Sequence, residues 1–295
     1  MNDYVLTCCS TADISKEAFE ERKIYYACFH FKIDEQEYLD DLGKSYPIDK
    51  FYDAIKKGAK PVTAQVNSEQ YIELWEPFLK ENKNILHVTL SSGISGTINS
   101  ALLAQRYLKD KYPNLEIKVV DSLGASSGYG MFMTYLADKR DEGYSFEECY
   151  KWAEENKLNV HHWFFSTDLT SYRRGGRISA TSFFLGQLLK ICPLLNMDNL
   201  GRLIPRKKIR TKEKTIVEMV EKMVEHAQNG VNYDGKCYLC HSACLEDAQK
   251  VVALIEEKFV NLKGKVVINN IGTVIGSHTG PGTVALFFMG DKRVD

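Results

Sequence analysis

The stretch Val88–Thr97, VTLSSGISGT, marks the point where the chain changes from a strand to a helix. Its first residues suit the end of a buried strand, its middle is small and rich in hydroxyl groups, and a helical pattern follows. A loop of this kind points backbone N–H groups and hydroxyls away from the carboxyl end of a parallel sheet, where anions tend to bind. The stretch therefore predicts an α/β fold with an anion site. It leaves open whether the anion is a phosphate, a carboxylate or the oxyanion of an acyl group beside a nucleophilic serine.

The regions that flank this loop show the same alternation of strand and helix. Short β-branched or aromatic runs predict strands at Tyr4–Thr7, Ile24–Phe31, Ile85–Leu90 and Ile117–Asp121. Such alternation is typical of a parallel sheet. Two helices are predicted to begin with capping boxes, because Asn67 is followed three residues later by Gln70 and Ser145 by Glu148.

The character of the sequence changes near residue 160. VHHWFFS predicts a strand, and it is followed by the Arg/Gly-rich SYRRGGRIS and the apolar ATSFFLGQLLKICPLL. Farther on, Asn199–Gly201 suits the turn of a hairpin, and Thr211–His226 and Leu245–Phe259 suit amphipathic helices. We therefore expect two α/β lobes, with residues 1–160 holding the parallel sheet and the serine loop and residues 161–295 forming the second lobe.

Composition excludes several classes of function. The 295 residues include 38 Lys and Arg against 39 Asp and Glu, for a net charge of −1, so there is no overall charge signature of nucleic-acid binding. No apolar run approaches the roughly 18 residues of a membrane span, and the N-terminus does not resemble a signal peptide. We expect a cytoplasmic protein whose eight cysteines are reduced.

Catalysis by the serine loop is one alternative. Ser95, Asp121 and His278 occur in the nucleophile–acid–base order of α/β-hydrolases, which would make the chain a self-sufficient serine hydrolase or acyltransferase using Ser95 and His278. The elbow motif G-x-S-x-G, however, needs a glycine where this chain has Thr97. A nucleotide site is disfavoured because no lysine follows the loop as in a P-loop. Ser95 or Thr97 could also serve only as a helix cap.

The segment CYLCH has the spacing of a covalent haem attachment site. Its flanks predict a strand, in which Cys237 and Cys240 would point to opposite faces and could not hold one metal. We therefore expect buried thiols, with no metal and no cofactor.

Two further stretches combine glycines with a charged or titratable side chain. Arg177 follows two glycines in RRGGRIS, and His278 lies among glycines in IGSHTGPG, which we interpret as a loop. Glycines let the backbone approach a ligand closely, and a guanidinium can bind an oxyanion.

Taken together, these stretches resemble the DegV family, the fatty-acid-binding proteins that serve as the acyl-carrying subunit of the bacterial fatty acid kinase. The resemblance rests on motifs that occur in the family's order along nearly the whole chain: STAD near the N-terminus, PVTAQ at Pro61–Gln65, LSSGISGT at Leu90–Thr97, VVDS at Val119–Ser122, GGRIS at Gly175–Ser179, IRT at Ile209–Thr211 and GSHTGPG at Gly276–Gly282.

The resemblance implies that a long-chain fatty acid, for example palmitate or oleate, lies in an apolar tunnel between the two lobes. It also implies that Thr63 and Ser95 hold the carboxylate, that Arg177 and Arg210 face a partner or a phosphate, and that a further set supports the head group or its loop. This supporting set comprises Ser92, Gly93, Gly96 and His278.

By the same resemblance the chain is not a complete enzyme. It would present the fatty acid to a separate ATP-dependent kinase subunit for acyl phosphate formation, with at most transient membrane contact. Two positions depart from the family's pattern: Cys9 stands where the family has an acidic residue, and Ala64 stands where it has a second hydroxyl.

Overall fold

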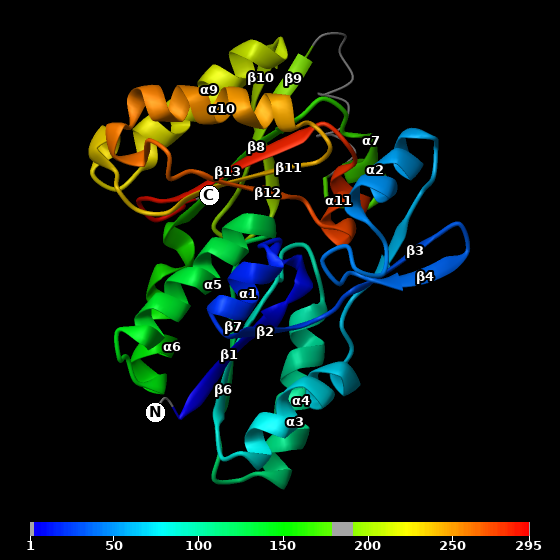
Figure 1. The fold of residues 1–295 in the computed structure, drawn as a ribbon, viewed down its shortest axis with the longest axis vertical. Coiled ribbons are helices and arrows are strands. Elements are labelled where there is room, and N and C mark those ends of the chain that lie inside the picture. Colours follow the sequence, from blue (N-terminus) through cyan, green and yellow to red (C-terminus); the bar gives the residue numbers. More distant parts are fainter. Residues whose placement is uncertain (1–2, 179–190, 295) are drawn as a thin grey trace.

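A four-stranded parallel sheet forms the first part of the fold (Figure 1). The computed structural model describes residues 3–178 and 191–294. The strands follow the order β2-β1-β6-β7. They are β1 (Tyr4–Cys9), β2 (Ile24–Ala27), β6 (Asn84–Thr89) and β7 (Ile117–Asp121). The predicted parallel sheet is confirmed, and its carboxyl edge carries the serine loop.

Helices cover both faces of this sheet. They are α1 (Lys16–Glu21), α3 (Ser68–Lys80), α4 (Thr97–Lys111), α5 (Ser126–Asp141) and α6 (Phe146–Asn156), with the short η1 (Ser10–Ala12) and η2 (Lys157–Asn159). Helices α3 and α4 lie together on one side, and α5 and α6 on the other (Figure 1). Both predicted capping boxes are present, Asn67 with Gln70 and Ser145 with Glu148. These local signals fixed the starts of α3 and α6 correctly.

The second part of the fold is a six-stranded mixed sheet in the order β10-β9-β8-β13-β11-β12. Its strands are β8 (Val160–Ser166), β9 (Ile191–Met197), β10 (Leu203–Arg210), β11 (Cys237–His241), β12 (Val267–Asn270) and β13 (Thr283–Met289). Among the described strand pairs of this six-stranded sheet, only β11 and β12 are parallel, and the others are antiparallel. The predicted hairpin is confirmed, since Met197 pairs with Leu203 across its turn.

One face of the six-stranded sheet is covered by two long helices. These are α9 (Lys212–His226) and α10 (Leu245–Lys258) (Figure 1). Helix α5 of the first lobe contacts β8, β11 and β13. The remaining elements of this part are α7 (Thr170–Arg174), α11 (Thr273–Thr279), η3 (Gly230–Asn232) and η4 (Val260–Leu262). The sheet thus has one face toward its own helices and the other toward the first lobe.

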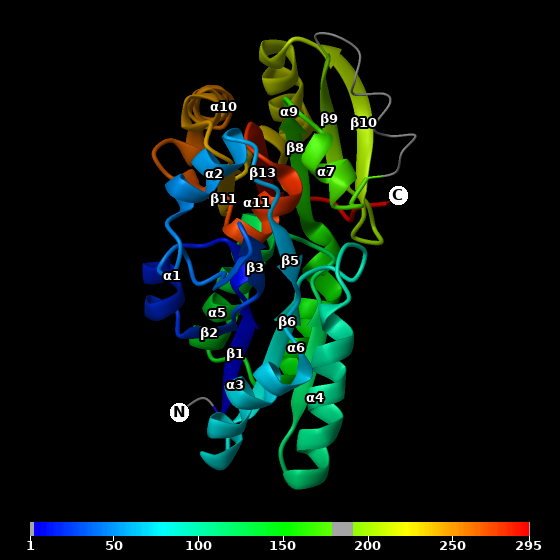
Figure 2. The same cartoon turned by 90° about the vertical axis from the view of Figure 1, so that its right-hand side faces the viewer.

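A small antiparallel sheet, β4-β3-β5, projects to the side of the parallel sheet in Figure 1, and its strands β3 and β5 face the viewer in Figure 2. It consists of β3 (His30–Ile33), β4 (Gln36–Leu39) and β5 (Val62–Ala64), with α2 (Ile48–Lys56) between β4 and β5. The prediction of a single strand over Ile24–Phe31 is therefore wrong. The chain leaves the parallel sheet after Ala27 and joins the small sheet at His30.

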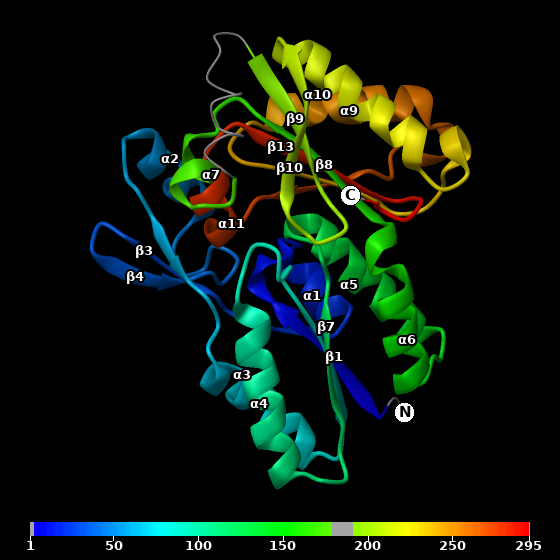
Figure 3. The same ribbon diagram turned by 180° about the vertical axis from the view of Figure 1, so that it is seen from behind.

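The two lobes meet closely at the serine loop and near the C-terminal segment (Figure 3). Ser91 Oγ donates to the carbonyl oxygen of Gly201 at 2.8 Å, and a Cβ on Gly93 would lie 2.5 Å from that same oxygen. Buried Arg293 donates to the carbonyls of Asp198 in one lobe and Leu123 in the other, at 2.9 and 2.8 Å. Division of the chain at residue 160 remains a prediction. Most of the apolar segment that follows GGRIS lies outside the described residues.

Candidate functional site

A cavity of about 460 Å³ lies between the inner face of the six-stranded sheet and the carboxyl edge of the first lobe. Its wall is mostly apolar, and its larger aliphatic and aromatic side chains come from both lobes: Phe29, Leu90, Ile94, Phe164, Tyr172, Met197, Leu203, Ile271, Val274, Ile275 and Phe287. A cavity of this size and lining is typical of a binding site for one largely apolar small molecule.

Thr63 and His278 meet at this cavity. Thr63 lies on the short strand β5, and its Oγ1 is 2.9 Å from Nε2 of His278. His278 was expected in a loop, but it lies in the last turn of helix α11, which begins after Gly272 and ends at Gly280. Burial, together with the positive charges of Arg177 and Arg174, lowers the pKa of His278 to about 4, so the ring is neutral at pH 7.

Hydrogen-bonding capacity remains free beside this pair. Nδ1 of His278 and Oγ1 of Thr279 are both buried without a partner among the described residues. Both residues line the cavity. Since a buried polar atom without a partner costs free energy, a ligand that reached these atoms with polar groups would relieve that cost. Thr279 was not singled out from the sequence, although it lies in the same HTGPG motif.

Ser95 and Arg177 also belong to the polar part of the wall. Ser95 lines the cavity, and its Oγ accepts from the backbone N–H of Thr97 at 3.3 Å, which holds the turn before α4. Arg177 also lines the cavity, and its Nε donates to the carbonyl of Ile94, next to Ser95, at 3.2 Å. Gly175 packs directly against the His278 ring, because a Cβ there would lie 2.3 Å from Nδ1. We call Thr63, Ser95, Arg177, His278 and Thr279 the head-group cluster.

A second set of polar residues lines the cavity but has its hydrogen bonds already made. We call Ser126, His162 and Cys240 the interior polar group. His162 accepts from the N–H of Ala125 at Nε2 (3.2 Å), so its proton is on Nδ1, which donates to the carbonyl of Val160 (3.0 Å). Ser126 donates to the carboxyl group of Asp13, and its Oγ lies 3.3 Å from the sulfur of Cys240. These residues offer a ligand little beyond apolar contact.

Several residues expected at the site lie outside the cavity wall. Ser92 is exposed, and its N–H donates to Asp121 at 3.1 Å. Gly93 packs against the hairpin turn of the second lobe, and Gly96 is the N-cap of α4. Arg210 is exposed at the end of β10. The glycines therefore shape the serine loop, while the functional roles of all four residues remain predictions.

The geometry gives no support to the hydrolase alternative. The His278 ring is paired with Thr63, and the Asp121 carboxylate accepts from the backbone N–H groups of Ser92 and Leu123. A catalytic triad needs a serine–histidine contact and a histidine–carboxylate contact. Here the carboxylate holds the loop instead.

Cys9 and Ala64, the two positions that depart from the family's pattern, place a neutral thiol and a methyl group where the family has polar side chains. Cys9 is buried, its sulfur lies 3.2 Å from the hydroxyl of Tyr71, and burial raises the pKa of its thiol to about 11. Position 9 is therefore neutral here, and Ala64 contributes a methyl group to the cavity wall. Strand β11 separates Cys237 from Cys240 as predicted, with Cys240 on the cavity side.

A family model decides the relationship of this chain to known proteins, because the model for an uncharacterised family named DegV matches residues 7–291. The chain belongs to the DegV family. It is 36% identical over 293 residues to a DegV domain-containing protein of Clostridium perfringens, covering 99% of both chains.

Solved structures of DegV proteins share the whole fold. The structure of DegV from Bacillus subtilis, described as a fatty acid binding protein, matches with a TM-score of 0.84 at 28% identity, covering 99% of this chain and 100% of that one. The Streptococcus pneumoniae fatty acid kinase B3 protein, loaded with linoleic acid, matches with a TM-score of 0.84 at 20% identity over 99% of this chain and 100% of that one. At that identity the second likeness concerns the fold alone. The two-lobed fold is thus shared with these solved structures.

Proposed function

We propose that this DegV protein binds one long-chain fatty acid in the cavity between its lobes and carries it to a separate kinase. The observation that carries the proposal is a mostly apolar cavity between the lobes whose wall includes a polar cluster with an arginine and three hydroxyl groups. The related B. subtilis protein of the same family is described as fatty acid binding, which supports the choice of ligand.

The tail would supply most of the binding free energy. Burial of apolar surface stabilises by roughly 0.8 kcal/mol per methylene, so a sixteen-carbon chain yields on the order of 10 kcal/mol before the costs of association. The interior polar group is compatible with this, since its saturated hydrogen bonds leave no charge or free donor against the chain.

The carboxylate would lie at the head-group cluster, with Thr63 and Ser95 as its direct ligands. A buried carboxylate without partners costs several kcal/mol, so hydroxyl donors must offset that cost. Thr279 is a third candidate because its hydroxyl has no partner. Arg177 adds a positive charge on the same wall, which favours the ionised carboxylate.

The head-group cluster lacks the groups that phosphoryl transfer from ATP requires, which is consistent with a separate kinase partner. The head-group cluster contains one arginine, a neutral histidine and hydroxyls, but no acidic residue to hold Mg²⁺ and no phosphate loop. A separate ATP-dependent subunit would therefore phosphorylate the presented carboxylate, and this protein would have no catalytic activity of its own. The described fatty acid kinase B3 protein with linoleic acid has the same fold.

Free cysteines and an ATP-using partner suit the cytoplasm. No helix in residues 3–178 or 191–294 is long and apolar enough to cross a membrane.

Native mass spectrometry of the purified protein, followed by lipid extraction, tests the proposal. We expect a bound fatty acid at close to one per chain, because an apolar cavity is more stable when filled. An apo mass together with no uptake of added oleate or palmitate would contradict fatty acid binding. Acyl ester turnover by the protein alone would contradict the carrier role.

A further inference from the structure

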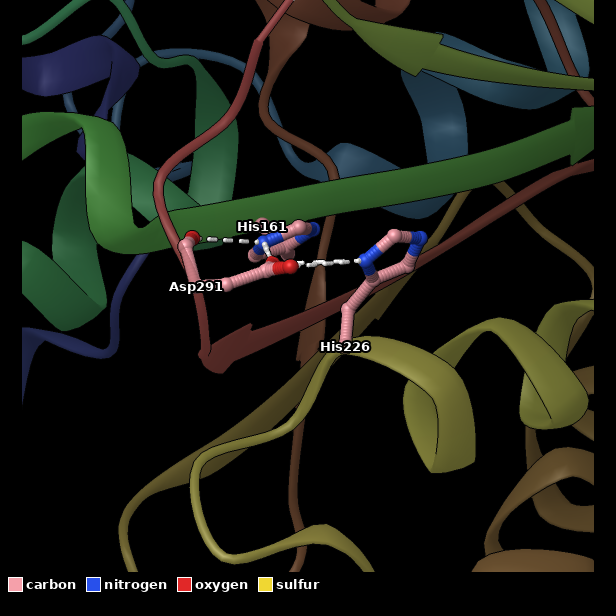
Figure 4. Close-up of side chains that lie close together, drawn as sticks. All are labelled: His161, His226 and Asp291. Carbon is pink, nitrogen blue, oxygen red and sulfur yellow. Dashed lines mark hydrogen bonds and ion pairs between the residues drawn. The ribbon is translucent and has the colours of Figure 1, made fainter.

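A cluster of two histidines and one aspartate lies apart from the cavity (Figure 4). His161 is in β8, His226 is the last residue of α9, and Asp291 follows β13. His161 and His162 are neighbours in one strand, so their side chains point to opposite faces of the sheet. Since His162 lines the cavity, the cluster is on the face covered by α9.

The candidate ligand atoms of this cluster lie close together. Nε2 of His161 lies 2.9 Å from Oδ1 of Asp291, and Nδ1 of His226 lies 3.2 Å from the same oxygen. All three ligand atoms lie within 4.8 Å of one another. Ligand atoms at about 2.0–2.2 Å from a tetrahedral zinc ion are roughly 3.3–3.6 Å apart. The rings of His161 and His226 stack with centroids 4.9 Å apart and planes 21° from parallel, so one ring would have to rotate to bring both nitrogens onto one ion.

The backbone already holds the three ligands together. The N–H of Asp291 donates to the carbonyl of His226 at 3.1 Å, and the N–H of Gly290 donates to the carbonyl of Asn159 at 2.8 Å. A Cβ on Gly290 would lie 2.4 Å from the carbonyl oxygen of His226, so glycine permits this approach. Because these contacts exist without an ion, little ordering remains to be done when one binds.

The ring nitrogens that would not bind the ion are also suitably placed. Nε2 of His226 lies 3.5 Å from Oε1 of Glu225, and a carboxylate beside the second nitrogen is the usual partner of a metal-binding histidine. Nε2 of His161 donates to the backbone carbonyl of Asp291 at 2.9 Å, and Nδ1 is buried without a partner among the described residues. An ion at Nε2 would displace that hydrogen bond and require the ring proton to be on Nδ1.

We propose that His161, His226 and Asp291 form a binding site for a divalent transition-metal ion, with zinc the best match. Two imidazoles and one carboxylate suit zinc better than calcium or magnesium, which prefer oxygen ligands. Three protein ligands leave a fourth position for water. The bound ion would join the start of β8, the end of α9 and the segment after β13.

Titration of the full-length, chelator-treated protein with zinc tests this proposal. We expect one saturable site by calorimetry and, at about 100 times the dissociation constant, a melting temperature raised by about 5 °C or more. Cobalt should bind with the spectrum of nitrogen and oxygen ligands and without the near-ultraviolet bands of thiolate ligation. The affinity should be the same with or without bound fatty acid, because the site lies on the opposite face of the sheet.

Three variants decide whether these residues are the ligands. His226→Gln and Asp291→Asn should each weaken zinc binding at least tenfold, since each removes one ligand while keeping a side chain of similar size. His30→Gln is the matched control, because His30 is also paired with a carboxylate, that of Glu37 at 2.8 Å, but lies outside the cluster. Unchanged affinity in both cluster variants, thiolate bands with cobalt, or no saturable binding below millimolar zinc would overturn the proposal.

Discussion

The head-group cluster and the interior polar group are both polar and both line one cavity, yet they differ in how their hydrogen bonds are used. In the interior, His162 donates to Val160 and accepts from Ala125, so no capacity remains. In the head-group cluster, His278 and Thr279 each keep one buried atom without a partner among the described residues. Residue type alone does not separate a lipid's tail region from its head-group region. Under the proposed function, the unfilled hydrogen bonds would mark the head-group region, because a saturated polar group behaves toward a ligand much like an apolar one.

The largest expected effect comes from placing an unsatisfied charge in the interior. Ala285 is buried, lines the cavity and lies on β13. Ala285→Asp should reduce fatty acid affinity more than about a hundredfold, because an unpaired buried carboxylate costs roughly 3 kcal/mol or more. Titration with a fluorescent fatty acid measures this loss. Ala285→Val is the matched control and should bind within a few-fold of the unaltered protein, and full affinity in Ala285→Asp would remove the distinction between the two regions.

Removing a hydroxyl from the head-group cluster should affect phosphorylation more than binding. Ser95→Ala should weaken affinity by only a few-fold, because one neutral hydroxyl contributes about 0.5–1.5 kcal/mol. The rate of acyl phosphate formation with a fatty acid kinase should fall about a hundredfold, because small displacements at a reacting centre are costly.

Thr63→Ala should behave in the same way, and the double variant should be less than additive if both hydroxyls hold one carboxylate. Exposed Ser92 offers the control Ser92→Ala. An unchanged phosphorylation rate in Ser95→Ala would mean that the residue is only a helix cap.

Substitution of the two arginines expected from the sequence should affect fatty acid affinity differently. Arg177 lines the cavity and Arg210 is exposed at a strand end. Arg177→Ala should therefore lower fatty acid affinity about tenfold, in keeping with the loss of a charged donor worth about 1.5 kcal/mol, whereas Arg210→Ala should change affinity less than twofold. Arg177→Lys should recover part of the loss, since the charge remains but the planar guanidinium does not. Equal effects on affinity would show that the position of Arg177 on the cavity wall does not matter for binding.

The smallest expected effect is on the pH dependence of stability. The pKa of His278 is lowered to about 4, while an unfolded histidine titrates near about 6.5. Between these two pKa values the unfolded chain binds a proton at His278 that the folded chain does not. The free energy of unfolding therefore decreases as the pH falls from about 6.5 toward 4. Between pH 6.5 and 5.5 the loss should be about 1 kcal/mol.

Urea unfolding of His278→Gln against the unaltered protein measures that difference. A bound carboxylate should raise the pKa of His278 and so reduce the loss, whereas the lowered pKa of interior His162 should respond little to the ligand. A ligand effect of the same size in His278→Gln would contradict a head group beside this residue.

Local sequence signals predicted the elements that depend on local contacts. The capping boxes at Asn67 and Ser145 and the hairpin turn near Gly201 each involve residues only a few positions apart. The break after Ala27 was missed because strand propensity continues through it, and the choice of sheet depends on pairing with Thr63, far along the chain. Helix α11 was interpreted as a loop because its glycines hide a short helix that packs against α7 and α2.

In the candidate site too, some residues could be predicted from the sequence and others depend on contacts between distant segments. Thr63, Ser95, Arg177 and His278 came from the family resemblance, and all four line the cavity. The interior polar group was missed because nothing in the strand VHHWFFS distinguishes His162 from its neighbour before the pairing of β8 is known. The cluster of His161, His226 and Asp291 joins three distant segments, so no spacing in the sequence could indicate it.

The position of β13 bears on when the protein becomes able to take up its ligand during synthesis. This strand is the last of the six in chain order, but it lies between β8 and β11 in the middle of the sheet and supplies Ala285 and Phe287 to the cavity wall. A ribosome releases the first lobe earlier, and that lobe can begin to fold as a unit. The sheet of the second lobe stays divided until β13 has left the exit tunnel. A nascent chain therefore exposes the halves of a lipid-binding wall before it can enclose a lipid, and this is the interval in which chaperones would protect it.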